Sequence, residues 1–316
     1  MDSEVLRPAV VETAEAIAEM EIRGAATIAD AAAGALATQA AESDAETAAD
    51  LRRELTTAAR RLHDTRPTAV SLPNALRYVL RDLDVDDRDR LRERVVERAD
   101  TFRAELADAR EDLGRIGAGR LRDGDVVMTH CHSTDALAVV EAAVEQGKAL
   151  EAIVKETRPR NQGHITARQL SELGVPVTLV VDNAAHQFLN EADHVLVGAD
   201  SIAADGSVVN KIGTSGLAVN ARERGVPIVV AAQTIKLHPG TLTGTAVEIE
   251  ERATDEVVDE ATRQELGDVT VRNPAFDVTP PRHVDAIVTE HGQFPPESVV
   301  TLMRERFGTS VVAPWE

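Results

Sequence analysis

The 316-residue sequence predicts an α/β protein in which an N-terminal helical domain precedes a domain built on a parallel sheet. Residues 1–118 are rich in Ala, Glu and Arg and place apolar residues every three or four positions, as amphipathic helices do. From residue 125, short runs rich in Val and Ile alternate with helical segments. The turn-rich stretch GAGRLRDGD at 117–125 separates the helical pattern from the pattern of alternating strands and helices. We therefore place the domains at 1–120 and 121–316.

The helical pattern of the first domain is clearest in two segments. Residues 27–62 and 86–116 both repeat apolar residues at helical spacing. Between them, RPTAVSLPNALR at 66–77 begins irregularly because of its prolines. We therefore expect helices on both sides of an irregular entry segment.

The second domain contains six short apolar runs that are typical of strands. They are DVVMTH at 125–130, LEAIVKE at 150–156, VPVTLVVD at 175–182, HVLVGAD at 194–200, VPIVVAA at 226–232 and HVDAIVTE at 283–290. Helical segments such as STDALAVVEAAVEQG, TARQLSELG and SGLAVNARERG lie between several of them. Near-continuous apolar strands that alternate with helices predict a Rossmann-like parallel sheet with helices on both faces.

The composition indicates a protein with a strongly acidic surface. The net charge is −20, and only four of the 34 basic residues are lysine. An acidic surface with little lysine is typical of a cytoplasm rich in salt, where screening removes the self-repulsion; a GC-rich genome also favours Arg over Lys. We expect a halophilic protein. We expect no nucleic-acid partner, because such a surface repels phosphate backbones.

The sequence also argues for a cytoplasmic location. It holds no uninterrupted apolar stretch of about 18 residues, so we expect no membrane span and no membrane partner. The N-terminal MDSEVLRPAV lacks the basic and apolar regions of a secretory signal. A single cysteine excludes an internal disulfide, which fits a reducing compartment.

Polar and reactive residues follow the predicted strands, at the ends where open α/β sheets bind ligands. In chain order they are Cys131, then Glu156, Thr157 and Arg158, then Asp182 and Asn183, then Asp200 and Ser201, then Gln233 and Thr234. A lone cysteine is most often a small buried apolar residue. This position instead predicts that Cys131 faces a site.

Cys131 and Asp200 are the candidate reacting groups. Cys131 precedes a helix, whose dipole lowers the pKa of a thiol, so it could exchange protons near neutrality. His130 and His132 flank it, but neighbouring strand residues point to opposite faces, so we do not expect a metal site. Asp200 would be an acid/base partner, with a helix or turn cap as the alternative. We expect Asp135 in the first turn of the following helix, where it complements the dipole.

Three features indicate phosphate binding. Lys211 and the Gly- and Ser-rich stretch 213–216 resemble an anion site at a helix N-terminus, although a simple capped loop is the alternative. Three of the four lysines, at 155, 211 and 236, lie at or near strand ends. In KETRPRNQG at 155–163, Arg158 or Arg160 could hold a carboxylate or phosphate through two hydrogen bonds. The nucleotide P-loop pattern is absent from the sequence.

Together, several motifs resemble one family. They are RGAATIADAAAGAL, RPTAVSLPNALR, THCHS, KETRPRNQG, VDNA, VGADSI, NKIGT and NPAFDVTPP. In this order they resemble the sugar-phosphate isomerases related to regulatory subunits of the initiation factor 2B exchange factor, and among these the archaeal branch that acts on ribose 1,5-bisphosphate. The resemblance runs from about residue 20 to the C-terminus.

The resemblance implies a helical domain, a Rossmann-like domain, and dimers that often assemble into hexamers. It implies conversion of ribose 1,5-bisphosphate to ribulose 1,5-bisphosphate in AMP salvage, with Cys131 and Asp200 catalytic. The matching phosphate and sugar contacts are Arg23, Gly24, Ala25, Arg66, Arg158, Asn210, Lys211 and Lys236. Some members respond to AMP. Neither a metal nor a cofactor is implied, and the sequence has no GxGxxG fingerprint.

Two other functions stay open. Methylthioribose-1-phosphate isomerases share the fold and the catalytic pair, but usually read THCNTG where this chain reads THCHST. They need an apolar pocket where a bisphosphate enzyme needs a second phosphate anchor. Noncatalytic regulatory subunits tend to lose the Cys and the Asp, and this chain keeps both.

Overall fold

A computed structural model describes residues 5–22, 24–66, 70–244, 247, 249–308 and 313–315. The chain divides into two compact units. The first comprises Met1–Ala109, Thr234–Gly240 and Thr301–Glu316, and the second comprises Arg110–Gln233 and Thr241–Val300. The first unit thus includes two short segments from the C-terminal half of the sequence. The domain boundary placed at residue 120 stays a prediction.

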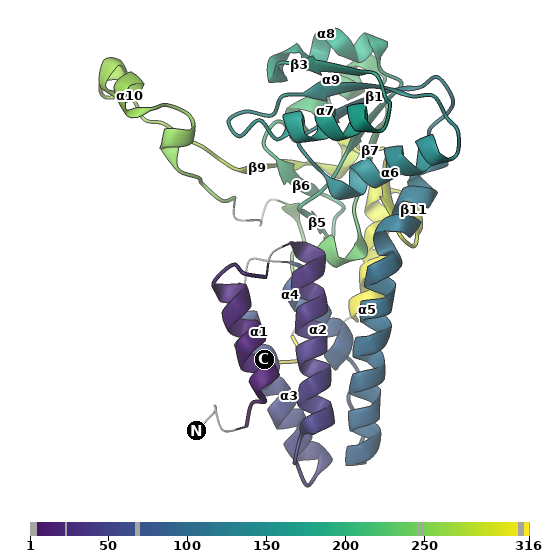
Figure 1. Ribbon diagram of the computed structural model, residues 1–316, viewed down its shortest axis with the longest axis vertical. Coiled ribbons are helices and arrows are strands. Elements are labelled where there is room, and N and C mark those ends of the chain that lie inside the picture. Colours follow the sequence, from purple (N-terminus) through teal and green to yellow (C-terminus); the bar gives the residue numbers. More distant parts are fainter. Residues whose placement is uncertain are drawn as a thin grey trace. The chain divides into compact units, whose positions relative to one another are not determined.

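The first unit is built from helices, as its apolar periodicity predicts (Figure 1). They are α1 (Pro8–Ala18), α2 (Ala25–Glu42), α3 (Ala48–His63), α4 (Ser71–Leu80) and the turns of α5 (Arg88–Ala118) up to Ala109. Helix α2 packs against α1, α3 and α4 through Ala and Leu side chains. From the C-terminal half, this unit adds the short strand β8 (Leu237–His238) and the residues of α11 (Val299–Phe307) from Thr301 on.

The periodic segment 27–62 forms two helices, not one. Its break lies at 43–47, where the Thr47 hydroxyl accepts a hydrogen bond of 3.1 Å from the Asp50 amide and caps α3. A Thr with an Asp three residues later is an N-cap pattern that periodicity alone does not detect.

Within the described residues, the second unit holds a seven-stranded sheet. In spatial order the strands are β11 (Gly292–Phe294), β10 (Ala286–Thr289), β7 (Ile228–Ala231), β4 (His194–Val197), β1 (Val126–His130), β2 (Glu151–Lys155) and β3 (Val177–Val180). All neighbouring pairs from β10 to β3 are parallel, and β11 is antiparallel to β10. Each of the six predicted runs contains one parallel strand, so the predicted α/β class is confirmed.

The strand order reverses beside β1. The chain proceeds from β1 outward to β2 and β3, and then returns to β4 on the opposite side of β1. Ligands of open α/β sheets bind at such a reversal, beyond the carboxyl ends of the strands. The fold therefore places a candidate site after β1 and β4.

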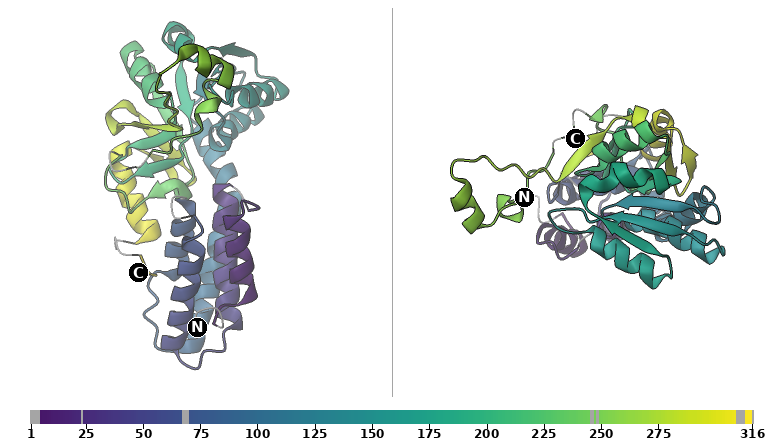
Figure 2. Two further views of the ribbon diagram at one scale, coloured as in Figure 1. Left: turned by 90° about the vertical axis from the view of Figure 1, so that its left-hand side faces the viewer. Right: turned by 90° about the horizontal axis from the view of Figure 1, so that it is seen from above.

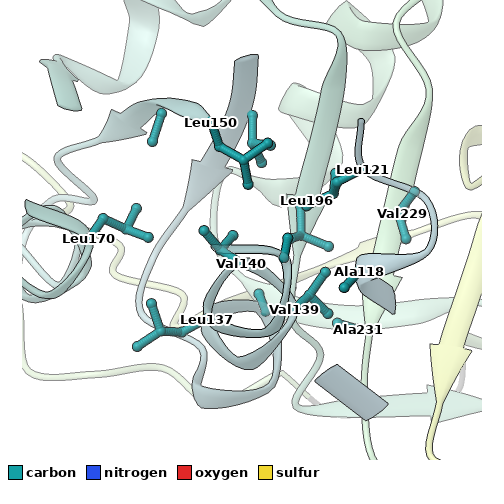
Figure 3. Packing of buried hydrophobic residues seen from close by; sticks show 14 of the residues in the cluster. Ala118, Leu121, Leu137, Val139, Val140, Leu150, Leu170, Leu196, Val229 and Ala231 are labelled. Carbon is teal, nitrogen blue, oxygen red and sulfur yellow. The ribbon is translucent and has the colours of Figure 1, made fainter. Parts of the chain in front are cut away.

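Both faces of the sheet are buried. Helices α6 (Thr134–Glu145) and α7 (Gly163–Glu172) pack on one face, where Figure 3 shows Val139 and Val140 close to Leu196 of β4. Strand residues of the opposite parity, such as Val195, are buried as well. Helix α9 (Thr214–Arg224) contacts β7 and also packs against α8 (Ala185–Phe188).

Three further strands of this unit lie outside the six predicted runs. Strands β5 (Ser201–Ala203), β6 (Val208–Lys211) and β9 (Phe276–Thr279) pair antiparallel. Between β6 and β9 in the chain, a mostly exposed segment carries α10 (Glu260–Leu266) and extends away from this unit's sheet (Figures 1 and 2). None of the helices in the described ranges is long and apolar enough to cross a membrane.

Candidate active site

Cys131 and Asp200 lie at the reversal of strand order. Cys131 directly follows β1, and Asp200 follows the neighbouring β4 after Gly198 and Ala199. Cys131 is 7% exposed, whereas Asp200 is exposed. The charges of Asp200 and Lys211 both act on the Cys131 thiol, so the three groups belong to one site.

Gly198 lies directly against the loop that follows Cys131, and a side chain at this position would not fit. A Cβ atom at Gly198 would lie 2.2 Å from Oγ of Ser133, which caps α6 by accepting a hydrogen bond from the Ala136 amide. Gly198 therefore lets β4 lie close to the loop between Cys131 and α6.

Burial raises the pKa of the Cys131 thiol, and Asp200 raises it further. The His132 backbone amide, Lys211 and Arg252 act in the opposite direction without reversing the shift. The expectation of a lowered pKa is therefore wrong, because the cost of burying the thiolate exceeds these attractions. At neutral pH Cys131 holds its proton and is available as an acid.

Hydrogen bonds hold the backbone of Cys131, whose φ is 70°. Its amide donates to Oγ1 of Thr157 at 2.8 Å, and its carbonyl accepts from Oγ1 of Thr166 at 2.9 Å. The Thr157 amide in turn donates to Oδ1 of Asp182 at 3.0 Å. The loops after β1, β2 and β3 are thus joined, and Cys131 keeps one backbone geometry.

His130 is buried beneath this arrangement and is neutral. Its Nε2 lies 2.8 Å from the Ile212 carbonyl oxygen, which only accepts, so Nε2 carries the proton. Its Nδ1 lies 3.2 Å from the Thr157 hydroxyl, which donates to the Lys155 carbonyl at 3.1 Å. Burial lowers the pKa of His130 to about 4, and the nearby Lys155 adds to that shift.

This neutral histidine makes stability depend on pH. The imidazole pKa is about 4 in the folded chain and 6.5 by reference, so the unfolded chain binds more protons between these values. The stabilisation is therefore complete above about pH 6.5 and is lost as the pH falls toward 4, by about 3 kcal/mol. Urea unfolding at steps between pH 7.5 and 4 measures it. His130→Gln should make the profile less steep between about pH 4 and 6.5, while the lowered pKa values of His132, His238 and His283 leave part of the slope. An equally steep profile in that variant would contradict the assignment.

Asp135 lies in the first turn of α6, as expected, and is buried. Its carboxylate accepts from Nε2 of Gln233 at 2.8 Å and from the Gln233 amide at 3.2 Å. Asp135 therefore joins the start of α6 to the end of β7. The Asp135 carboxylate therefore has a structural role, which accounts for an acidic side chain close to the predicted phosphate site.

Lys211 and Asn210 end strand β6. The Lys211 ammonium lies 4.3 Å from the ring centroid of Phe276, the residue paired with it on β9. Nδ2 of Asn210 donates to Oγ1 of Thr214 at 3.0 Å, and that hydroxyl donates to the Lys211 carbonyl at 2.6 Å. Burial lowers the pKa of Lys211. The Asn210 side chain is thus held at the start of α9, and the Lys211 ammonium lies against Phe276 of β9.

The predicted anion site at 213–216 already holds a carboxylate of the chain. Oδ2 of Asp277 accepts from the Gly213 amide at 2.7 Å, and both of its oxygens accept from the Ser215 amide at 3.1 Å. The prediction of free amides for phosphate is therefore corrected at Gly213 and Ser215. Asp277 lies on β9, far along the sequence, so only the pairing of β6 with β9 reveals this capping.

The loop after β2 contributes two arginines with different partners. Arg160 forms a two-point ion pair with Glu256. Arg158 is exposed and lines a pocket together with Lys211 and Arg252. Of the two alternatives in KETRPRNQG, Arg158 is the one left able to hold a ligand.

The remaining candidates belong to the first unit. Gly24, with a φ of 86°, precedes α2, and Ala25 is its first residue. Helix α2 contacts the 234–236 turn that carries Lys236. Arg66 is half-buried, and its amide donates to the His63 carbonyl. Arg23 lies outside the described residues.

The structure thus gathers Cys131, Asp200, Asn210 and Lys211 in the second unit, with Arg158 in the neighbouring pocket. Sequence reasoning did not assign roles to His130, Asp277 or Arg252, and it counted Lys155 only among the lysines that indicate phosphate binding. The scarcity of lysine had already drawn attention to Lys155, which is buried with its Nζ 3.4 Å from the Gly213 carbonyl. Asp277 lies within the motif NPAFDVTPP, which gave it no role, and no local pattern distinguishes Arg252.

Comparisons with known proteins agree with this architecture. A model of the initiation factor 2 subunit family matches residues 21–296. The chain is 70% identical over 315 residues to the ribose 1,5-bisphosphate isomerase of Haloferax volcanii, covering 100% of this chain and 97% of that protein. The protein of the same name from Haloterrigena turkmenica is 68% identical over 317 residues, covering 98% and 97%.

A solved structure has the same fold. The 5-methylthioribose 1-phosphate isomerase of Pyrococcus horikoshii superposes with a TM-score of 0.70 at 34% identity, covering 94% of this chain and 87% of that one. The chain therefore belongs to the initiation factor 2 subunit family, and within it to the sugar-phosphate isomerases.

Proposed function

We propose that the protein converts ribose 1,5-bisphosphate to ribulose 1,5-bisphosphate, with Cys131 and Asp200 as its acid/base pair. The observation that carries the proposal is the placement of a buried cysteine after β1 and an aspartate after the neighbouring β4, where the strand order reverses. The charges of Asp200 and Lys211 both act on the thiol, whose pKa is raised. Near-complete coverage at 70% identity by a protein named for this reaction supports the choice of substrate.

The protonation states suggest an order of steps. Cys131 gives its proton to the ring oxygen as the bond from C1 to that oxygen breaks. The thiolate then takes the proton from C2, which leaves a double bond between C1 and C2. Cys131 returns this proton to C1, while Asp200 takes the O2 proton and C2 becomes a ketone. Transfer of that proton from Asp200 to Cys131 restores the starting state.

The surrounding residues support these steps. Lys211 would stabilise the negative charge that develops on O2. Thr157 and Thr166 hold Cys131 through its backbone, so the thiol stays oriented while its proton moves. Both phosphates remain attached throughout, which suits a chain with several cationic positions. We assign Arg23, Gly24, Ala25, Arg66, Asn210 and Lys236 to substrate binding as part of this proposal.

A direct assay tests the substrate. Purified protein in molar KCl receives α-ribose 1,5-bisphosphate, and coupling to RuBisCO detects ribulose 1,5-bisphosphate. 5-Methylthioribose 1-phosphate serves as the rival substrate because the Pyrococcus structure carries that activity in its name. We expect kcat/KM for the bisphosphate to be at least about 100-fold higher, since a site that holds a second phosphate rejects an apolar replacement. Absence of bisphosphate turnover, with and without AMP, would reject the proposal.

The wider setting follows from the same proposal. The product would feed a RuBisCO in AMP salvage, and AMP would act as an activator. The protein would be cytoplasmic and homo-oligomeric, as a dimer or a trimer of dimers. Light scattering in molar KCl, with and without AMP, distinguishes these assemblies.

We also propose that the protein is halophilic. At a net charge of −20, repulsion between carboxylates extends about 10 Å at 0.1 M salt and about 3 Å at 1 M. The melting temperature should therefore rise between 0.1 M and 2 M KCl. An uncharged osmolyte that matches the water activity of the KCl serves as the control and should stabilise less. A melting temperature independent of KCl would contradict this proposal.

A further inference from the structure

A pocket of about 220 Å³ lies beside Lys211 and gathers four cationic side chains. These are Arg158, Arg160, Lys211 and Arg252, and Glu256 and Asn273 also line it. The chain carries 54 acidic against 34 basic residues, so four cations around one hollow contrast with its overall charge.

The arginines differ in their partners. Arg160 donates through Nε and one terminal nitrogen to both oxygens of Glu256, at 3.0 and 2.5 Å. Arg252 donates to Glu250 through Nε alone, at 3.1 Å. In the part of the chain that the structure describes, the terminal nitrogens of Arg252 and the guanidinium of Arg158 make no hydrogen bond. Two arginines of this pocket can therefore still bind an anion.

Arg252 is held in place before any ligand arrives. Its amide donates to the Asn273 carbonyl at 2.9 Å, and the Asn273 side chain donates to the Ala253 carbonyl at 2.8 Å. Its guanidinium carbon lies 5.7 Å from the ring centroid of Phe276, the same ring that Lys211 contacts. One aromatic ring thus positions two cations together, which lowers the ordering cost of binding.

The pocket adjoins the reacting pair without containing it. Arg252 and Lys211 both lower the pKa of Cys131, so their charges reach the thiol. Among the described residues that line the pocket, neither Cys131 nor Asp200 occurs. An anion here would lie next to the reacting carbons and not on them.

We propose that Arg158 and Arg252 bind the C5 phosphate of the substrate beside Lys211, and that they set the preference for a bisphosphate over a monophosphate. This assignment rests on the proposed function. The C1 phosphate is attached to a reacting carbon and must stay against Cys131, whereas the C5 phosphate is remote and does not change during the reaction. Guanidinium groups suit a phosphate because two N–H donors match two oxygens.

The test compares Arg158→Gln and Arg252→Gln with Arg160→Gln, a matched control whose arginine lines the same pocket but already pairs with Glu256. Calorimetry at one fixed KCl concentration measures the binding of two ligands. They are ribulose 1,5-bisphosphate and ribose 1-phosphate, which lacks the phosphate on C5. We expect each test variant to bind the bisphosphate at least about 10-fold more weakly and ribose 1-phosphate within about twofold of wild type. The control should change neither affinity, and KM should rise in the test variants with little change in kcat.

Two results would overturn the assignment. In the first, the test variants bind the bisphosphate with the same affinity as Arg160→Gln. In the second, their affinity for ribose 1-phosphate falls by the same factor as their affinity for the bisphosphate. The proposed function fails separately, if wild type does not turn over ribose 1,5-bisphosphate. In that case, a selective loss of bisphosphate binding in Arg252→Gln would still support phosphate binding by this pocket. If wild type did not bind the bisphosphate either, phosphate binding by the pocket would be rejected.

Discussion

Replacing Cys131 with serine is expected to lower kcat for the isomerisation by about 10²- to 10⁴-fold, the range attributed to a positioned general acid/base group. Serine keeps the size of the side chain, but its hydroxyl is far less acidic than a thiol. The variant could neither protonate the ring oxygen nor carry a proton from C2 to C1. The RuBisCO-coupled assay in molar KCl measures this loss.

The fold should survive the substitution. The side chains of Thr157 and Thr166 bind the backbone of Cys131, and serine retains both of those contacts. Circular dichroism and the urea midpoint should therefore match wild type. Ser201→Ala, which removes a hydroxyl next to Asp200, is a control and should keep kcat within about threefold. Near-normal turnover by Cys131→Ser would contradict the mechanism, whereas inactivity of Asp200→Asn together with Cys131→Ser would support the pair.

Replacing Gly163 with alanine is expected to destabilise the fold by about 3 kcal/mol or more. Gly163 is buried at the start of α7, directly against the end of β2. A Cβ atom there would lie 1.8 Å from the Lys155 carbonyl oxygen and 2.9 Å from the carbonyl carbon. These are backbone atoms of β2, which pairs with a strand on each side, so they cannot move away as a flexible side chain could.

Urea unfolding of Gly163→Ala and Gly216→Ala tests this expectation. Gly216 lies within α9 and a Cβ atom there meets nothing within 4 Å. Alanine at that position should therefore stabilise by about 0.5–1 kcal/mol through helix propensity. Equal effects of the two substitutions would show that the close approach of α7 to β2 is not required for stability.

The parallel sheet could be predicted because its strands carry a local signal. Runs such as VPIVVAA are apolar on both faces, and this composition occurs where helices cover both sides of a sheet. The small strands β5, β6 and β9 lack such a signal, because they are short and lie among turn residues. The break between α2 and α3 depends on the N-cap at Thr47, and the apolar periodicity gives no sign of this cap.

Some residues of the candidate site could likewise be predicted from the sequence, and others could not. Cys131 and Asp200 could be expected at one edge because they directly follow strands of one parallel sheet. The capping of Gly213 by Asp277 could not, since 64 residues separate them and nothing near either residue indicates the pairing. For the same reason, Arg158 and Arg160 look alike in KETRPRNQG until Glu256 is seen beside Arg160.

The sequence by itself determined the helical N-terminal region, the six parallel strands and the reactive residues at their ends, because these depend on local composition and periodicity. The tertiary structure alone decided which groups stay charged and which charges stay free. It raised the pKa of Cys131 by burial, filled an anion site with Asp277, and left Arg252 beside Lys211. Burial and charge pairing depend on distances between residues remote in the chain, and only folding sets those distances.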